Sequence, residues 1–221
     1  MRRNTERAIP DHPSIAAVII ASGFSRRMGR SKLTLELDGS TFLERAIRAS
    51  IGASDIDRRI VVVRPEDAAL AHSLAERLVP AGDAHRAPAV EVLLNPDAAR
   101  GQSASVRLAA ERLAADPACA AVIYSVVDQP FLDVRVYNAL VDAWKARRGE
   151  ILVSAYGGQR GNPVLFARRF FDELSQLTGD VGGREVIRRH PEAVAEVPMP
   201  DPAAGRDIDT WEDYVAAGGG L

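Results

Sequence analysis

Short apolar runs separated by amphipathic stretches of helical length are the feature that most restricts the fold of this chain. The runs cover residues 15–20, 59–63, 90–94, 121–127 and 151–155. Continuous apolar runs of this length are typical of strands buried on both faces of a sheet. Apolar residues recur at helical spacing over residues 41–51, 66–79, 103–114 and 133–148. This alternation predicts an α/β fold with a mostly parallel sheet and helices on both faces.

The regular alternation weakens beyond residue 156. We expect short strands at 164–166 and 193–197, and helices at 168–177, 183–190 and 210–217. A length of 221 residues suits one large α/β domain. We therefore predict a single domain over residues 14–217, preceded by a loose tail at 1–13.

Charge and cysteine content exclude several classes of partner. Lys and Arg number 28 against 30 Asp and Glu, giving a net charge of −2. A near-neutral chain has no bulk electrostatic signature for nucleic acid or an anionic membrane. No apolar run reaches the ~18 residues that a membrane span needs, and no export signal is evident. Cys119 has no second cysteine with which to pair, which fits a reducing cytoplasm. We expect a cytoplasmic protein without nucleic-acid or membrane partners. Any anion that it binds must be held by a local cluster of basic residues.

A basic, glycine-punctuated loop follows the first apolar run and reads IASGFSRRMGRSK over residues 20–32. Gly23 and Gly29 would let the backbone approach a ligand and point N–H groups at anions. Four cations fall within seven residues, namely Arg26, Arg27, Arg30 and Lys32. Ligands of open α/β sheets bind beyond the carboxyl ends of strands. The loop therefore predicts a phosphate site, with a solvated basic turn as the alternative. A Walker loop and a Gly-x-Gly-x-x-Gly dinucleotide loop are both absent from the sequence.

Two further polar segments follow predicted strands. Asn95 comes after the third run and offers donor and acceptor groups, which suits a base edge. Ser103 could cap the next helix while its N–H groups face a ligand. Asp128 ends the fourth run, where a carboxylate can hold Mg²⁺ against phosphates. The alternatives are an ordinary strand–turn–helix connection for the first segment and a turn-capping Asp for the second.

Together these segments resemble the MobA-like nucleotidyltransferases, and most closely the molybdenum cofactor cytidylyltransferases. Residues 20–32 are similar to the family's Leu-Ala-Ala-Gly-x-Ser-x-Arg-Met-Gly-x-x-Lys signature. Further similar elements are the Asn, Gly and Ser of 95–105, Asp-Gln-Pro at 128–130, Gly-Asn-Pro-Val-Leu-Phe at 161–166, Gly-Asp-Val-Gly-Gly-Arg at 179–184, and the acidic segment at 207–213. The resemblance covers most of residues 15–215. It implies a Rossmann-like, nucleotide-diphospho-sugar transferase-like fold with a nucleotide half at about 14–130 and an acceptor half at about 131–217.

The resemblance also implies roles for individual residues. Catalytic roles fall on Arg27, Lys32 and Asp128, with Arg27 and Lys32 on the triphosphate. Nucleotide contacts fall on Ala21, Ser22, Gly23, Ser25, Arg27, Met28, Gly29, Lys32, Asn95, Gly101, Ser103 and Ser105. Mg²⁺ would be held by Asp128 and by Asp207, with Asp209 as the alternative metal ligand or the N-cap of the last helix. Acceptor contacts fall on Asn162, Pro163, Asp180 and Arg184.

The implied reaction is Mg²⁺-dependent transfer from an NTP, with CTP favoured, to a phosphorylated pterin, releasing pyrophosphate. A molybdoenzyme is the implied recipient of the product. Ser22 stands where the family usually has Ala or Gly, so the preferred base stays open; Asn162 stands where many relatives have His. Three alternatives remain: guanylyl transfer or another small-phosphate acceptor on the same fold, a non-catalytic cofactor chaperone, and a redox enzyme on the same scaffold.

Overall fold

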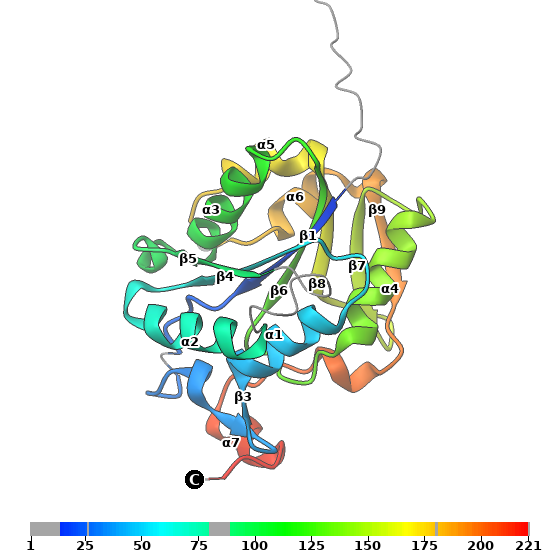
Figure 1. Cartoon of the computed structure of the whole chain (residues 1–221). Coiled ribbons are helices and arrows are strands. Elements are labelled where there is room, and N and C mark those ends of the chain that lie inside the picture. Colours follow the sequence, from blue (N-terminus) through cyan, green and yellow to red (C-terminus); the bar gives the residue numbers. More distant parts are fainter. Residues whose placement is uncertain (1–13, 26, 80–88, 180, 221) are drawn as a thin grey trace, which may run out of the picture.

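The five predicted apolar runs form five strands of one seven-stranded sheet in the computed structural model. The structure describes residues 14–25, 27–79, 89–179 and 181–220. The predicted N-terminal tail at 1–13 lies outside the described residues. The strand order is β5-β4-β1-β6-β8-β7-β9 (Figure 1). The strands are β1 (Ser14–Ile20), β4 (Arg58–Val63), β5 (Val90–Leu94), β6 (Cys119–Val126), β7 (Ile151–Tyr156), β8 (Gln159–Ala167) and β9 (Val194–Pro198). Every neighbouring pair is parallel except those that include β8, so the mostly parallel sheet is confirmed.

Strand β1 lies near the centre of the sheet, between β4 and β6. Val18 is in register with Ile60 on one side and Tyr124 on the other. Residues 16–19 are completely buried, because helices cover both faces of the sheet. This two-sided burial is why the strand reads as a continuous apolar run and not as an alternating pattern.

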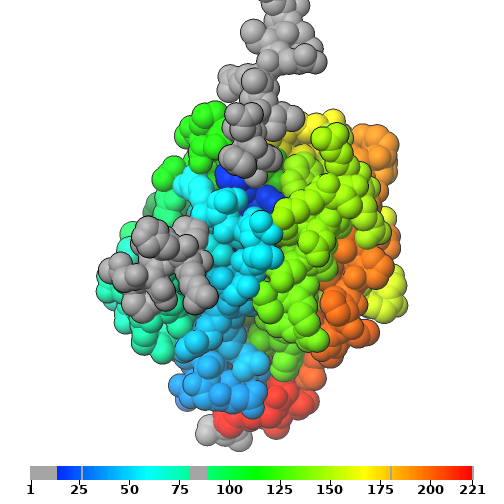
Figure 2. All heavy atoms as spheres, turned by 45° about the vertical axis from the view of Figure 1, so that its right-hand side comes forward, coloured from blue at the N-terminus to red at the C-terminus, as the bar shows by residue number. Residues whose placement is uncertain are grey.

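Helices α3 (Gln102–Ala114), α5 (Phe171–Ser175) and α6 (Arg184–Arg189) cover one face of the sheet. Helices α1 (Phe42–Gly52), α2 (Ala68–Leu78) and α4 (Val134–Lys145) cover the other face. Figure 2 shows α1 and α4 packed side by side on this second face. None of the helices in these described ranges is long and apolar enough to cross a membrane.

Two elements differ from the sequence-based expectation. The predicted short strand at 164–166 is the longer β8, which inserts antiparallel between β6 and β7. A short hairpin of β2 (Glu36–Leu37) and β3 (Ser40–Thr41) was not anticipated. The last helix, α7 (Trp211–Ala216), packs beside this hairpin, where the Tyr214 hydroxyl donates to the Glu36 carbonyl at 2.7 Å. The hairpin carries only two residues per strand, which is too short for a periodic sequence signal.

Two arginines, the buried Arg59 and the partly buried Arg168, fix the ends of two helices. Arg59, in β4, donates to the carbonyls of Ser50 and Ala53 at the C-terminus of α1. Arg168 donates to the carbonyls of Ala114, Asp116 and Cys119 beyond the C-terminus of α3. The last carbonyls of a helix have no partner within it and carry partial negative charge. Each guanidinium therefore stabilises a helix end while anchoring it to the sheet.

Candidate active site

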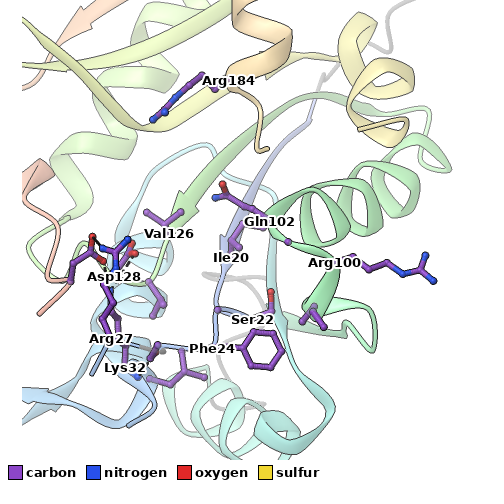
Figure 3. A pocket seen from close by; sticks show the side chains of 18 residues that line it. Ile20, Ser22, Phe24, Arg27, Lys32, Arg100, Gln102, Val126, Asp128 and Arg184 are labelled. Atoms are coloured by element: carbon purple, nitrogen blue, oxygen red, sulfur yellow. Dashed lines mark hydrogen bonds and ion pairs between the residues drawn. The ribbon is translucent and has the colours of Figure 1, made fainter. Parts of the chain in front are cut away.

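The loops after β1 and β6 meet at the carboxyl edge of the sheet. From β1 the chain proceeds outward through β4 and β5, while β6 lies on the opposite side of β1. Ligands of open α/β sheets bind at such a switch point. A cleft of 930 Å³ opens here, lined by loop residues between Ile20 and Leu33, by 98–102, by 126–128, and by Arg184 and Asp209 (Figure 3).

One end of the cleft holds a cluster of ionic groups. The Lys32 Nζ lies 2.7 Å from Asp209 Oδ1 and 3.7 Å from Asp128 Oδ2. Arg27 Nη1 lies 3.0 Å from Asp209 Oδ2. Lys32 is buried, whereas the Arg27 side chain is 73% exposed. Two of the predicted phosphate-binding cations, Arg27 and Lys32, thus lie together at this end of the cleft, and both form ion pairs with Asp209.

The surroundings of Asp128 at this end of the cleft disfavour the ionised form of its carboxyl group. Its Oδ1 is buried and has no hydrogen-bond partner among the described residues. Burial raises the pKa of Asp128; Lys32 partly opposes this increase, and the charges of Asp207 and Asp209 add to it. Burial also raises the pKa of Asp207, whereas the hydrogen bond from Lys32 lowers the pKa of Asp209. The backbone N–H of Ile208 donates to the Asp128 carbonyl at 2.9 Å, and this contact brings the acidic segment beside the strand end.

The donor set suits a magnesium ion that is shared with a ligand. No group of three His, Cys, Asp or Glu side chains within the described ranges could enclose a metal ion. Mg²⁺ usually binds through one or two carboxylates together with substrate phosphates and water. The buried, unpartnered Asp128 oxygen beside a second carboxylate fits this open arrangement.

Thr210, and not Asp209, caps the last helix. The Thr210 hydroxyl accepts from Asp213 N, and the Asp213 carboxylate accepts from Thr210 N. The N-cap interpretation of Asp209 is therefore wrong, because this reciprocal pair satisfies the first turn of α7. Asp209 instead lines the cleft, whereas Asp207 is not among the described residues that do.

The opposite end of the cleft holds none of the groups of the ionic cluster, although Arg100 lines it (Figure 3). Its walls come from Ser22 and Phe24 on one side and from 98–102 on the other (Figure 3). Phe24 is 40% exposed, and the Arg64 guanidinium lies 5.0 Å from the centre of its ring. Arg100 and Gln102 also line this end. Sequence reasoning missed Phe24, Arg100 and Gln102, since nothing in their spacing marks them.

Asn95 and Ser105 lie behind this wall. Both are buried and neither is among the described residues that line the cleft. The Asn95 amide donates to Ser105 Oγ at 2.8 Å, and Ser105 Oγ lies 2.5 Å from Ser22 Oγ. Direct side-chain contacts from Asn95 and Ser105 to a nucleotide are thus not supported, and only Ser22 of the three reaches the cleft.

Ser103 does not cap α3. The helix begins after Gly101, whose φ of 100° makes the turn, and no side chain caps it. Ser103 lies one residue inside the helix and its hydroxyl donates to the Gly179 carbonyl at 2.5 Å. The predicted cap is therefore wrong, and Ser103 instead ties the start of α3 to the loop that precedes α6.

Several residues of the first loop determine its conformation through burial, backbone geometry or hydrogen bonding. Ala21 and Met28 are buried in the core and do not line the described cleft. Gly29 adopts the left-handed region at φ 64°, as does Ser25 at φ 49°. Ser25 Oγ accepts from the Lys32 N–H at 3.0 Å, which closes the loop across seven residues. Of Ala21, Ser25, Met28 and Gly29, only Ser25 lines the cleft.

Arg184 is the predicted acceptor residue that the structure brings to the cleft. It starts α6 and lies across the cleft from the ionic cluster (Figure 3). It also lines a second pocket of 300 Å³, with Arg160, Ile187, Arg188, Pro191 and Val194. A Cβ on the preceding Gly183 would lie 2.6 Å from the ring of buried Phe166, so glycine permits this approach.

Asn162 and Pro163 line neither of the two cavities described above. They are joined by a cis peptide bond, and the Asn162 carbonyl accepts from the Tyr156 hydroxyl at 2.7 Å. Direct acceptor contacts from this pair are thus not supported. Asp180 lies outside the described residues.

Comparisons with known proteins point to one family. Residues 17–194 match the model of the MobA-like NTP transferase domain. The chain is 30% identical over 210 residues to the purine catabolism protein PucB of Bacillus subtilis, covering 91% of this chain and 95% of that protein. It is 26% identical to the nicotine blue oxidoreductase of Paenarthrobacter nicotinovorans, covering 91% and 95%, and 22% identical to the molybdenum cofactor cytidylyltransferase of Escherichia coli, covering 92% and 95%.

The fold has solved relatives as well. The crystal structure of Rv0371c from Mycobacterium tuberculosis superposes with a TM-score of 0.75 at 26% identity, covering 93% of this chain and 97% of that one. The family match spans most of the chain, and the cleft lies at the edge where the predicted motifs converge. The chain therefore belongs to the MobA-like NTP transferase family and is a nucleotidyltransferase.

Proposed function

We propose that the chain is a Mg²⁺-dependent cytidylyltransferase that transfers CMP from CTP to the phosphate of a molybdopterin-type acceptor and releases pyrophosphate. The observation that carries the proposal is the Asp128 carboxylate, with its buried unpartnered oxygen, beside Lys32 at the switch point of the sheet. The name of the Escherichia coli relative supports the choice of nucleotide and acceptor.

The triphosphate is proposed to lie at the ionic end of the cleft. Lys32 is buried there with a fixed orientation, and Arg27 is exposed enough to turn towards a phosphate. Asp209 pairs with both cations and so holds them at this end of the cleft. Gly23 and Ser25 line the same cleft, where their backbone can approach phosphate oxygens. The nucleoside is then directed towards Ser22 and Gly101.

Asp128 and Asp207 are the proposed Mg²⁺ ligands. Asp209 is already paired with two cations, whereas Asp207 has no ion pair among the residues that the structure describes. When bound, Mg²⁺ neutralises phosphate charge and polarises the reacting phosphoryl group. Asp128 and Asp207 would hold it, and Lys32 would neutralise charge that develops on the pyrophosphate.

The acceptor is proposed to enter from the side of Arg184. This guanidinium lines both cavities, so it can hold the acceptor phosphate while the body of the molecule extends over Ile187, Pro191 and Val194. The cleft-lining residues come from before residue 130 except for Arg184 and Asp209. This distribution supports a nucleotide half at about 14–130 and an acceptor half at about 131–217. An acceptor phosphate is already a competent nucleophile, so positioning and charge neutralisation carry the reaction.

Pyrophosphate release tests the proposal. CTP, GTP, ATP and UTP are each incubated with Mg²⁺ and molybdopterin, and release is expected with CTP and to fall strongly in Asp128→Ala. Asp172→Ala, at an exposed position on α5, is the matched control and keeps full activity. Release with GTP, or with another small phosphate, identifies the corresponding transferase of the same fold. Acceptor binding without release from any NTP identifies a cofactor carrier, and a pyridine-nucleotide absorbance change identifies a redox enzyme. An active Asp128→Ala variant contradicts the metal assignment.

The proposal places the protein in the cytoplasm, where a molybdoenzyme would receive the product. A single buried cysteine suits that compartment.

A further inference from the structure

The last helix, α7, contacts the basic loop that carries the predicted phosphate-binding cations. The indole N–H of Trp211, the first residue of α7, donates to the Met28 carbonyl at 3.0 Å. The Arg30 guanidinium lies 5.8 Å from the centre of the same indole ring, within the range of a cation–π contact. Trp211 therefore contacts the tip of the loop at two residues, although 183 positions of sequence separate it from Met28.

The indole is itself held in place by the rest of α7. Its ring meets the Tyr214 ring edge-on, with centroids 5.6 Å apart and planes at 74°. The Tyr214 hydroxyl donates to the Glu36 carbonyl at 2.7 Å, which ties α7 to the hairpin of β2 and β3 (Figure 1). The reciprocal hydrogen bonds of Thr210 and Asp213 fix the first turn of α7, where Trp211 lies. Trp211 therefore offers the loop a donor of fixed position.

The loop is most easily distorted next to Met28. Gly29 follows it with a φ of 64°, and a glycine restrains the neighbouring peptide planes less than any other residue does. The peptide bond is planar, so the hydrogen bond that fixes the Met28 carbonyl also fixes the orientation of the Gly29 N–H. The Met28 side chain is buried in the apolar cluster against which Trp211 packs. Backbone and side chain together thus hold the chain immediately after Arg27.

Arg27 depends on this support more than Lys32 does. Lys32 is buried and its backbone N–H donates to Ser25 Oγ at 3.0 Å, so local contacts hold it. The Arg27 side chain is exposed and pairs with Asp209. A bound phosphate would compete with the Asp209 carboxylate for this guanidinium. The indole contact uses only a backbone carbonyl and leaves the cation free, so it can persist while Arg27 turns to a ligand.

We propose that Trp211 is a positioning residue for the triphosphate, which holds the loop at Met28 so that Arg27 reaches the β- and γ-phosphates from an ordered backbone. This inference rests on the proposed NTP site and deepens it. A backbone that is ordered before binding lowers the entropy that the ligand must overcome, so the support is measured as affinity. Because it reaches the ligand through Arg27, at the ionic end of the cleft, its effect falls on the phosphates and is the same for every base.

Trp211→Phe tests the inference, because it keeps an aromatic ring beside Tyr214 and removes the N–H donor. Binding of CTP, CMP and inorganic pyrophosphate is measured by titration calorimetry with Mg²⁺ and without acceptor. CTP and pyrophosphate are expected to bind about threefold to tenfold more weakly, the loss of one neutral hydrogen bond. CMP, which lacks the β- and γ-phosphates, binds as it does to the wild type, and the ratio of CTP to GTP affinity stays constant. Trp144→Phe, the same substitution at a partly buried tryptophan of α4, is the matched control and changes none of these affinities.

A double-variant cycle tests the route through Arg27. In an Arg27→Ala background, Trp211→Phe is expected to cause no further loss of pyrophosphate affinity, because no guanidinium remains to be positioned. Tyr214→Phe, which removes the hydrogen bond between α7 and the hairpin, is a second variant and gives the same pattern with a smaller loss. Thermal unfolding of each variant identifies any loss that comes from misfolding.

The outcomes separate this role from a structural one and from the proposed function. Unchanged pyrophosphate affinity in Trp211→Phe, an equal loss of CMP affinity, or the full loss repeated in the Arg27→Ala background would overturn the inference. If Trp211→Phe does not fold, the titrations of Tyr214→Phe decide in the same way. A wild-type protein that binds neither CTP nor pyrophosphate contradicts the proposed function, and the positioning role with it. Normal binding by the wild type and by both α7 variants contradicts the positioning role alone.

Discussion

Asp128→Asn is expected to leave the unliganded protein as stable as the wild type, or more stable, while abolishing most of its activity. At a separation of 3.7 Å, Lys32 attracts Asp128 by about 4.5 kcal/mol at an effective dielectric constant of about 20. Exposure of 34% of the Asp128 side chain reduces this attraction through solvent screening. The pKa of Asp128 is nevertheless raised, so burial and the carboxylates of Asp207 and Asp209 outweigh the attraction of Lys32.

The asparagine keeps the shape of the side chain and removes its charge. Lys32 still has Asp209 at 2.7 Å, so the substitution leaves no cation unpaired. We therefore expect the free energy of unfolding to rise by roughly 0–1 kcal/mol. Removal of one partner from a buried ion pair would instead lower it by ~3–5 kcal/mol. Turnover is expected to fall by about 10²- to 10³-fold, as on removal of one electrostatic contact to a transition state.

The pH dependence gives an independent check. A carboxyl whose pKa is raised on folding stabilises the protein fully at pH values below its unfolded pKa, and this contribution is lost as the pH rises through the folded value. The stability advantage of Asp128→Asn is therefore largest at neutral pH and disappears once the pH falls below the ordinary carboxyl range. Urea unfolding in EDTA at several pH values measures the advantage, and pyrophosphate release measures turnover. A loss of stability above about 3 kcal/mol, or retained turnover, would refute the reasoning.

Three further predictions concern the framework around the cleft. Gly183→Ala places a Cβ 2.6 Å from the ring of Phe166, so the loop before α6 must shift. The KM for acceptor is expected to rise more than the KM for nucleotide, and equal changes in the two KM values would contradict this. Arg168→Ala removes three hydrogen bonds to carbonyls, including that of Ala114, and is expected to lower the free energy of unfolding by roughly 2–3 kcal/mol in urea titrations. Burial raises the pKa of the Cys119 thiol to about 11, so native protein is expected to resist iodoacetamide at pH 7, and labelling before unfolding would disprove it.

Much of the sheet could be predicted because burial leaves a direct trace in the sequence. The completely buried centre of β1 requires apolar residues at every position, and this is what the run at 15–20 shows. The antiparallel insertion of β8 left no such trace, because a strand reads the same in either direction. The order of the strands depends on long-range pairing, which periodicity does not report.

The candidate site likewise contains residues that the sequence could predict and contacts that it could not. Motif positions predicted Lys32 in the loop after the first strand and Asp128 at the end of the fourth, and the structure brings both to one cleft. Asp209 joins Lys32 across 177 residues of sequence, a contact that no local pattern encodes. Thr210 could have been recognised as a helix cap from its spacing to Asp213, which leaves Asp209 free for the cleft.

The sequence by itself determined the α/β class, the buried strands and the basic loop, since these depend on local composition and on hydrophobic burial. Only the tertiary structure decided which polar groups reach the cleft. Asn95 and Ser105 carry the chemistry of a binding site, yet packing places them behind Ser22. A polar side chain in a sequence has donors and acceptors but no direction. Its direction is fixed by the partners that folding supplies, because a buried donor without an acceptor is too costly to retain.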